Sequence, residues 1–143
     1  MPNEVRGGFV HRREVVIPEM DSDKALRLRD DFHNALVELL APDFYPFEVA
    51  NAITRAERQG RITQAEGAIA LRDTLQHLPQ LEHVLTLLPR AYALSSQTRS
   101  AVFDCLYLAL AERERCQFIT ADDRVIKNLQ TQCPFLVPLA SLP

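Results

Sequence analysis

Hydrophobic and polar residues alternate along the chain partly at the spacing of helices and partly in short apolar runs typical of strands. The first periodic stretch covers residues 22–37, where Ser22 is a suitable helix N-cap. Apolar residues then recur every three or four positions, as on one buried helical face: Ala25, Leu28, Phe32 and Leu36. The pattern therefore predicts a first helix over residues 22–37.

The next two expected helices carry their own start and stop signals. One is predicted over residues 44–59, with Asp43 as its cap and Gly60 as its end. Thr63, followed three residues later by Glu66, forms the pattern of a capping box. We therefore expect another helix to begin at this point, and the two helices to be neighbours in sequence with a short connection.

Strands and helices alternate in the rest of the chain. Helices are expected over residues 89–97, 100–115 and 122–130, strands over 38–42, 116–120 and 135–140, and a short strand or loop over 83–88. Pro138 indicates that the last strand lies at a sheet edge. The alternation is typical of an α/β sandwich, in which helices surround a short, mainly parallel sheet. Ligands of such folds bind at the carboxyl ends of the strands.

Composition agrees with one soluble domain over residues 1–143. Apolar residues make up 47% and charged residues 24% of the chain, which is enough to form a core. No apolar run approaches the ~18 residues of a membrane span, and the N-terminus lacks the apolar region of a secretory signal. The three cysteines have no close metal-binding spacing, so we expect reduced thiols in a cytoplasmic protein.

The net charge of −3 argues against a protein that grips nucleic acid by bulk charge alone. The basic residues are unusual in kind, because all except Lys24 and Lys127 are arginine. A guanidinium group suits phosphate and carboxylate partners better than an ammonium group does. A genome that favours arginine explains the same bias.

One charged residue interrupts the most apolar helix of the chain. Asp104 lies within residues 101–111, "AVFDCLYLALA", and should be buried there. A favourable contact with the helix dipole contributes only ~0.3–1 kcal/mol, whereas burying a charge costs of the order of several kcal/mol. A wet site or a bound cation explains Asp104 better than the dipole does.

Two more acids lie where a site could form. Glu48 borders the apolar face of the helix over residues 44–59, side by side with Arg55. It is either an ordinary boundary carboxylate or one aimed into a cleft and partly balanced by the guanidinium. Asp122 directly follows an expected strand, so it either caps the next helix or meets a ligand. Asp123 is expected to be a surface acid.

If these three acids converge, their charges need a partner. Two carboxylates ~4 Å apart repel by roughly 4 kcal/mol at an effective dielectric constant near 20. A proton or a divalent cation relieves this repulsion. Oxygen ligands without a His or Cys cluster favour Mg²⁺ or Mn²⁺, and carboxylate-held Mg²⁺ points to phosphoryl chemistry.

Two segments of the chain resemble the PIN-domain family, and most closely its VapC-type toxins from toxin–antitoxin pairs. They are "LLAPDFYPFEVANAITRAERQGRIT" and "SAVFDCLYLALAERERCQFITADDRVIKNL". The resemblance implies a PIN-like α/β/α sandwich and a metal-dependent endoribonuclease. It also implies a cytoplasmic homodimer, with RNA as its substrate, that is silenced by a small cognate antitoxin and has no membrane partner.

The same resemblance implies roles for individual residues. Glu48 matches the acid of the family's "EVANA" helix, and Asp122 matches the acid of its "TAD" motif. Asp104 matches the acid of the "YDALYLALAE" helix, with Phe103 in the tyrosine position. Each acid would be a catalytic residue and would hold Mg²⁺ or Mn²⁺. Arginines near the cleft would meet RNA phosphates: Arg55, Arg58 and Arg99.

One acid of the family pattern is missing. The family's first strand ends in an aspartate shortly before a Pro-Glu pair such as Pro18-Glu19, which puts that aspartate near position 8. This chain has Gly7 and Gly8 there, so residues 1–14 are atypical. The cation site would keep three of four acids.

Other residues could replace the missing acid. Residues 14–18, "EVVIP", could supply the strand and leave Asp21 or Asp23 near its end. Glu4 or Glu14 could also be recruited. Three hypotheses therefore remain: an active ribonuclease, a catalytically impaired PIN domain that binds an antitoxin or RNA, and an unrelated soluble domain whose acids are scattered.

Overall fold

The structure is a computed structural model, and it describes residues 3–6, 9–16 and 37–141. Within these residues, one sheet contains five parallel strands in the order β4-β3-β2-β5-β6, and β1 pairs antiparallel with β2. The strands are β1 (Asn3–Arg6), β2 (Phe9–Val16), β3 (Val37–Pro42), β4 (Gln80–Glu82), β5 (Gln117–Thr120) and β6 (Leu136–Pro138). The predicted short and mainly parallel sheet is confirmed, with Pro138 in an edge strand.

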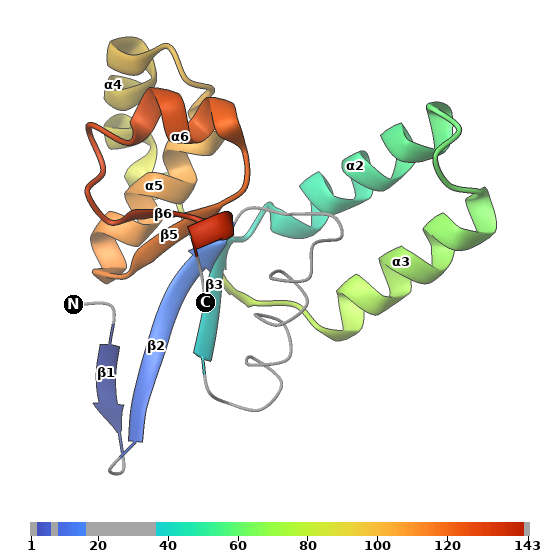
Figure 1. Cartoon of the computed structure of the whole chain (residues 1–143), viewed down its shortest axis with the longest axis horizontal. Coiled ribbons are helices and arrows are strands. Elements are labelled where there is room, and N and C mark those ends of the chain that lie inside the picture. The colour runs from blue at the N-terminus through green and yellow to red at the C-terminus, as the bar shows by residue number, and fades with distance from the viewer. Residues whose placement is uncertain (1–2, 7–8, 17–36, 142–143) are drawn as a thin grey trace.

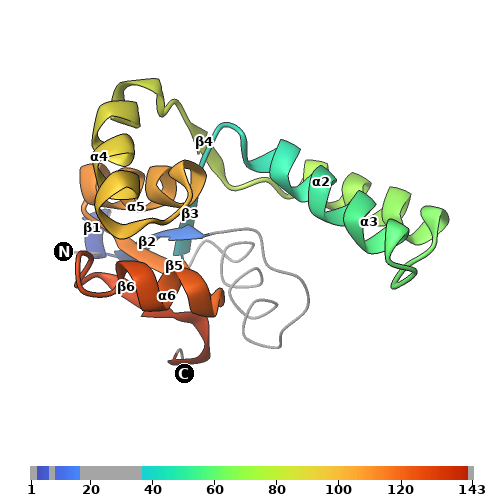
Figure 2. The same ribbon diagram turned by 90° about the horizontal axis from the view of Figure 1, so that it is seen from above.

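Helices lie on both sides of this sheet. They are α2 (Tyr45–Arg58), α3 (Gln64–Gln76), α4 (Leu88–Thr98), α5 (Val102–Glu114) and α6 (Asp123–Leu129), with short 3₁₀ turns η1 (Leu85–Leu87) and η2 (Leu139–Ser141). Helices α4, α5 and α6 gather on one side, and α2 and α3 extend from the other as a hairpin (Figures 1 and 2). The expected α/β sandwich is confirmed. The helix predicted over residues 22–37 lies outside the described residues, apart from residue 37, which begins β3.

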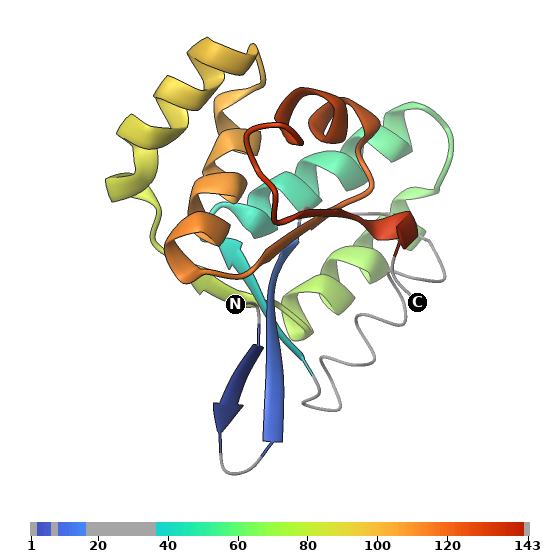
Figure 3. The ribbon, with the colours of Figure 1, turned by 60° about the vertical axis from the view of Figure 1, so that its left-hand side comes forward.

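Strand β2 is the centre of the sheet. Its residue Val15 lies opposite Leu40 of β3 on one edge and Phe118 of β5 on the other. Strand β1 pairs only with the first half of β2, and this part of the sheet projects away from the helices (Figure 3). The second half of β2 is therefore the part that the flanking strands and helices enclose.

The position of β2 corrects the expectation for the N-terminal acid. The central strand was expected to end near position 8, but β2 begins at Phe9 and its carboxyl end is at Val16. Val16 pairs with Ile119, just before β5 ends. Residues 14–16, one of the alternatives for the missing strand, belong to β2, while Asp21 and Asp23 lie outside the described residues. The sequence did not mark this strand clearly, because its middle residues, from His11 to Glu14, are all polar.

The helix ends follow the sequence signals in two places. Thr63 Oγ1 accepts a hydrogen bond from the Glu66 N–H at 3.1 Å, and Glu66 Oε1 accepts one from the Thr63 N–H at 2.9 Å. The predicted capping box is thus confirmed. Gly60 ends α2 with a φ of +72°, a conformation that side chains disfavour.

Asp43 does not cap α2 as predicted. The N-cap of α2 is Phe44, and no side chain caps the helix there. Asp43 instead continues the pairing of β3 with β4, because its N–H donates to the Glu82 carbonyl oxygen at 2.9 Å. Its carboxylate lies 2.9 Å from Nδ1 of His83.

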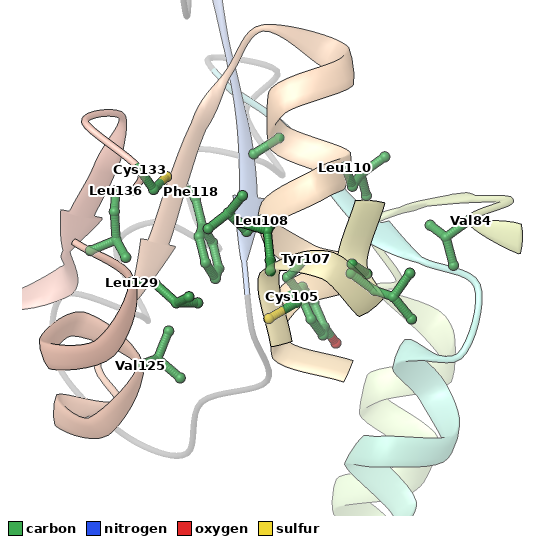
Figure 4. Close-up of a cluster of buried hydrophobic side chains, with 14 of the residues drawn as sticks. Val84, Cys105, Tyr107, Leu108, Leu110, Phe118, Val125, Leu129, Cys133 and Leu136 are labelled. Atoms are coloured by element: carbon green, nitrogen blue, oxygen red, sulfur yellow. The ribbon is translucent and has the colours of Figure 1, made fainter. Parts of the chain in front are cut away.

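Helix α5 forms the centre of the hydrophobic core. Its residues from Cys105 to Ala111 are all buried, which confirms the expectation from its apolar sequence. The ring of Tyr107 stacks on that of Phe118 from β5, with ring centroids 6.4 Å apart and an interplanar angle of 10°. Figure 4 shows these rings among side chains of α6 and β6. This packing fixes the start of α5 against the sheet.

No helix within the described residues has the length and apolar character that a bilayer crossing requires.

Candidate active site

The three predicted acids come from three different elements that meet at one edge of the sheet. Glu48 lies in the first turn of α2, which follows β3, and Asp122 is the N-cap of α6, which follows β5. Both helices therefore start at the carboxyl ends of strands that flank β2. Asp104 lies in the first turn of α5, whose far end leads into the amino end of β5, so that its start is at the same edge.

Asp104 shows that the acids lie close enough to interact. Its side chain is half-buried, and its pKa is raised from 3.8 to about 6. Desolvation is the main cause of this shift, followed by repulsion from Asp122 and then from Glu48. The nearby Arg124 opposes the shift. The fold thus gathers three carboxylates from a sequence range that spans more than seventy residues, from Glu48 to Asp122.

Glu48 is held by a tyrosine rather than by an arginine. Tyr107 donates its hydroxyl proton to Glu48 Oε1 across 2.6 Å. Burial raises the pKa of Glu48, and this hydrogen bond partly offsets the effect. Burial and the neighbouring Glu48 raise the pKa of Tyr107, so that its hydroxyl stays a donor. Arg55, the partner expected from the sequence, is exposed, and the side-chain hydrogen bond to Glu48 comes from Tyr107 instead.

Asp122 both caps a helix and faces the other acids. Its Oδ1 accepts hydrogen bonds from the N–H groups of Arg124 at 2.9 Å and Val125 at 3.3 Å. Its own N–H donates to Oγ1 of the buried Thr120 at 3.0 Å. The capping hypothesis for Asp122 is confirmed, and the cap fixes the orientation of the carboxylate next to Asp104. Asp123 is exposed, as predicted.

The chemistry of these side chains fits a hydrated divalent cation of the Mg²⁺ type. All three donors are carboxylate oxygens, and their mutual repulsion is what a cation would relieve. Over the part of the chain that the structure describes, no three His, Cys, Asp or Glu side chains are arranged to hold one metal ion together. Mg²⁺ is commonly bound by one or two carboxylates with water filling the other positions. The set therefore fits a partly water-coordinated ion and not a closed protein cage.

The three arginines predicted to bind phosphate are all exposed, two on α2 and one before α5. Arg99 is exposed in the connection between α4 and α5, where it adopts a left-handed conformation with a φ of 60°. Arg55 and Arg58 are exposed in the last turn of α2. At the helical rise of about 1.5 Å per residue, they lie on the order of 10–15 Å along the axis from Glu48. Their contact with substrate stays a prediction.

Sequence reasoning missed two residues of this site, Tyr107 and Arg124. Tyr107 lies three positions after Asp104, so the two side chains are neighbours along the same side of the helix. A tyrosine within an apolar helix needs a partner for its hydroxyl, and this signal could have pointed to a buried acid. Arg124 follows two positions after Asp122, and only the fold brings its charge near Asp104.

The fold and the site together define a class of protein. The chain belongs to the PIN-domain family, whose model matches residues 15–130. The resemblance inferred from the sequence is therefore confirmed. The matched range begins within β2 and includes Glu48, Asp104 and Asp122.

Named relatives show which members of the PIN-domain family this chain is similar to. The chain is 29% identical over 103 residues to the VapC ribonuclease Mb0985 of Mycobacterium bovis and to the ribonuclease VapC9 of Mycobacterium tuberculosis. Each alignment covers 72% of this chain and 80% of the relative. Among solved structures, PAE2754 from Pyrobaculum aerophilum has the same fold, with a TM-score of 0.64 and 17% identity over 92% of this chain and 93% of that one. The chain is thus a PIN-domain protein similar to VapC ribonucleases.

Proposed function

We propose that this chain is a Mg²⁺-dependent endoribonuclease, the toxin of a toxin–antitoxin pair. The observation that carries the proposal is the interaction of Asp104 with Asp122 and Glu48 at the carboxyl edge of the sheet. The names of the VapC relatives support the reaction class, since each is a ribonuclease. The reaction is hydrolysis of an RNA phosphodiester bond, in which water is the nucleophile and the metal ion, when bound, would activate it.

The three carboxylates would bind the metal ion, and the bound ion would position the RNA phosphate that is cleaved. Glu48, Asp104 and Asp122 would hold Mg²⁺ or Mn²⁺ together with water molecules, and the hydroxyl of Tyr107 keeps Glu48 in one orientation. When bound, Mg²⁺ supplies positive charge that stabilises the charge on the phosphate and makes water a better nucleophile. Arg124 adds a fixed positive charge beside Asp104. Other arginines bind the phosphates further along the RNA: Arg55, Arg58 and Arg99.

Cleavage of a labelled RNA by the Asp104→Asn variant tests this proposal. Wild type should cleave an unstructured RNA in the presence of Mg²⁺ and stop when a chelator is added, whereas Asp104→Asn should lose at least about 100-fold in rate. Asp73→Asn is the matched control, because Asp73 lies on α3 and pairs with His77. Equal rates for wild type and Asp104→Asn contradict the assignment.

A second function follows from one specific observation. No three described acidic, His or Cys side chains are arranged to hold a metal ion together. A catalytically impaired PIN domain would keep its antitoxin-binding or RNA-binding surface without cleavage. Calorimetric titration with Mn²⁺ separates the two functions, because an impaired domain should show no binding heat and still bind its partner.

The proposal includes a cytoplasmic protein with a cognate antitoxin and a homodimeric state. Support for self-association comes from one exposed stripe on η1 and α4, formed by Leu85, Leu88 and Tyr92. These residues are three and four positions apart, so they share one helical face. Arg90, which is next to this stripe, is neutralised by a bidentate pair with Glu112. An uncharged stripe suits a two-fold contact, where each residue meets a copy of its own surface.

A further inference from the structure

Two aromatic residues are exposed next to the acids of the candidate site. Phe103 is 56% exposed and directly precedes Asp104 in α5. Phe47 is 74% exposed and directly precedes Glu48 in α2. Single exposed apolar residues are ordinary on protein surfaces. Here, however, each of two phenylalanines adjoins a carboxylate of the same cluster.

The ring of Phe103 is held in place by other aromatic rings. It meets Phe44 edge to face, with centroids 5.1 Å apart and an interplanar angle of 75°. Phe44 in turn meets Tyr107 edge to face at 5.5 Å. Since Tyr107 donates to Glu48, a continuous chain of contacts links Phe103 to the acids. The exposed ring is therefore fixed at the rim of the site before any ligand arrives.

The charges around these rings favour a nucleotide over an apolar protein segment. The charges of Asp122, Glu48 and Arg124 all act on Asp104, the residue that follows Phe103. An apolar helix that covered the ring would also bury these charges, at a large cost in desolvation. A nucleotide has an apolar base face for the ring and a phosphate for Arg124 and for the cation that the acids would hold.

We propose that Phe103, with Phe47 on the neighbouring helix, forms a stacking platform for unpaired bases of the RNA beside the cleaved phosphate. This inference rests on the proposed ribonuclease function and extends it by naming residues that would contact bases of the substrate. Bases within a duplex are stacked on each other and cannot reach an aromatic side chain, so the platform requires an unpaired base. It should depend little on base identity at the stacked position, because every base has a π face.

Steady-state kinetics on RNA test the role of the ring. Phe103→Leu keeps an apolar side chain and removes the aromatic face, so KM for an unstructured RNA should rise about tenfold. Phe103→Tyr should restore KM to within about twofold of wild type. Ile69→Ala is the matched control, because Ile69 is 61% exposed on α3 and lies outside both the aromatic cluster around Phe103 and the stripe on η1 and α4. An unchanged KM in Phe103→Leu, or equal cleavage of the single strand and its duplex, overturns the inference.

A fluorescence experiment reads out stacking independently of cleavage. The chain contains no tryptophan, so Phe103→Trp and Ile69→Trp each introduce a single reporter. A single-stranded oligonucleotide should quench the tryptophan at position 103 and leave that at position 69 unchanged, and the matching duplex should quench neither. Equal quenching at the two positions contradicts stacking.

These outcomes separate the two proposals. If wild type cleaves no RNA but position 103 is quenched by single strands, the ribonuclease proposal fails and the binding platform stands. If wild type cleaves RNA and Phe103→Leu changes only the oligomeric state in light scattering, Phe103 belongs to a contact between copies and the platform is overturned.

Discussion

At the scale of single residues, the ionised carboxylate of Asp104 costs folding free energy, and it lies at the edge of the sheet where ligands of such folds bind. Its carboxylate is half-buried and faces two further acids, and Arg124 opposes their repulsion. A residue selected for stability alone would not carry this cost at the edge of the sheet where ligands bind. The cost is therefore best explained by binding of a positively charged ligand.

This cost predicts how stability depends on pH in metal-free buffer. The folded chain retains the Asp104 proton up to about pH 6, whereas the carboxyl in the unfolded chain has a pKa near 3.8. The folded state thus binds more protons between these values, and stability falls as pH rises through that range. Asp104→Asn should be more stable than wild type at pH 7 by about 1 kcal/mol, after allowance for the exposed part of the side chain.

Urea unfolding of both proteins in the presence of a chelator measures this difference. The gain of the variant should be present at pH 7 and should vanish near pH 4, where the wild-type carboxyl is neutral. A variant that is less stable than wild type at pH 7 would indicate that Asp104 makes a stabilising contact instead. The same variant should lose activity, so that stability and function change in opposite directions.

Tyr107→Phe is expected to separate the positioning of Glu48 from the packing of the core. The substitution keeps the ring on Phe118 but removes the donor to Glu48, leaving a half-buried carboxylate without this partner. The pKa of Glu48 should rise further, and stability should fall by about 1 kcal/mol. The acidic limb of the pH–rate profile should move to higher pH. Tyr92→Phe is the control, and an unshifted profile in Tyr107→Phe would exclude a positioning role.

At the scale of elements, the start of α3 is fixed by local interactions alone. Thr63 and Glu66 satisfy each other's backbone groups, and no residue of the acid cluster takes part. Thr63→Ala should destabilise the chain by about 1 kcal/mol in urea unfolding and leave kcat unchanged. Thr86→Ala, at an exposed position of η1, is the control. A loss of activity at full folding would show that the α2–α3 hairpin contributes to the site.

At the scale of the whole molecule, the exposed stripe on η1 and α4 predicts how copies of the chain associate. Leu85 is 77% exposed and Tyr92 is 66% exposed, and both lie on the stripe. In a two-fold contact the same patch is used by both copies, so the charges introduced on one copy would face those on the other. The double variant Leu85→Glu and Tyr92→Glu should therefore be a monomer where wild type is a dimer, as measured by light scattering. Ile69→Glu on α3 is the control, and a dimer that persists in the double variant places the contact elsewhere.

The sequence by itself determined the elements with local signals and the identity of the family. The capping box at Thr63, the glycine stop at Gly60 and the apolar run of α5 each depend on neighbours within a few residues, so they could be predicted. The family motifs pointed to Glu48, Asp104 and Asp122 for the same reason, since each motif is a short segment. Their roles as ligands remain predictions.

Only the tertiary structure decided which residues interact across the chain. In the folded chain the central strand extends to Val16. Asp43 extends the pairing of β3 with β4 and does not cap α2. The tertiary structure also replaced Arg55 by Tyr107 as the partner of Glu48. The physical reason is that each of these contacts joins segments distant in sequence. Their energy depends on distance and burial in the folded chain, which no local pattern records.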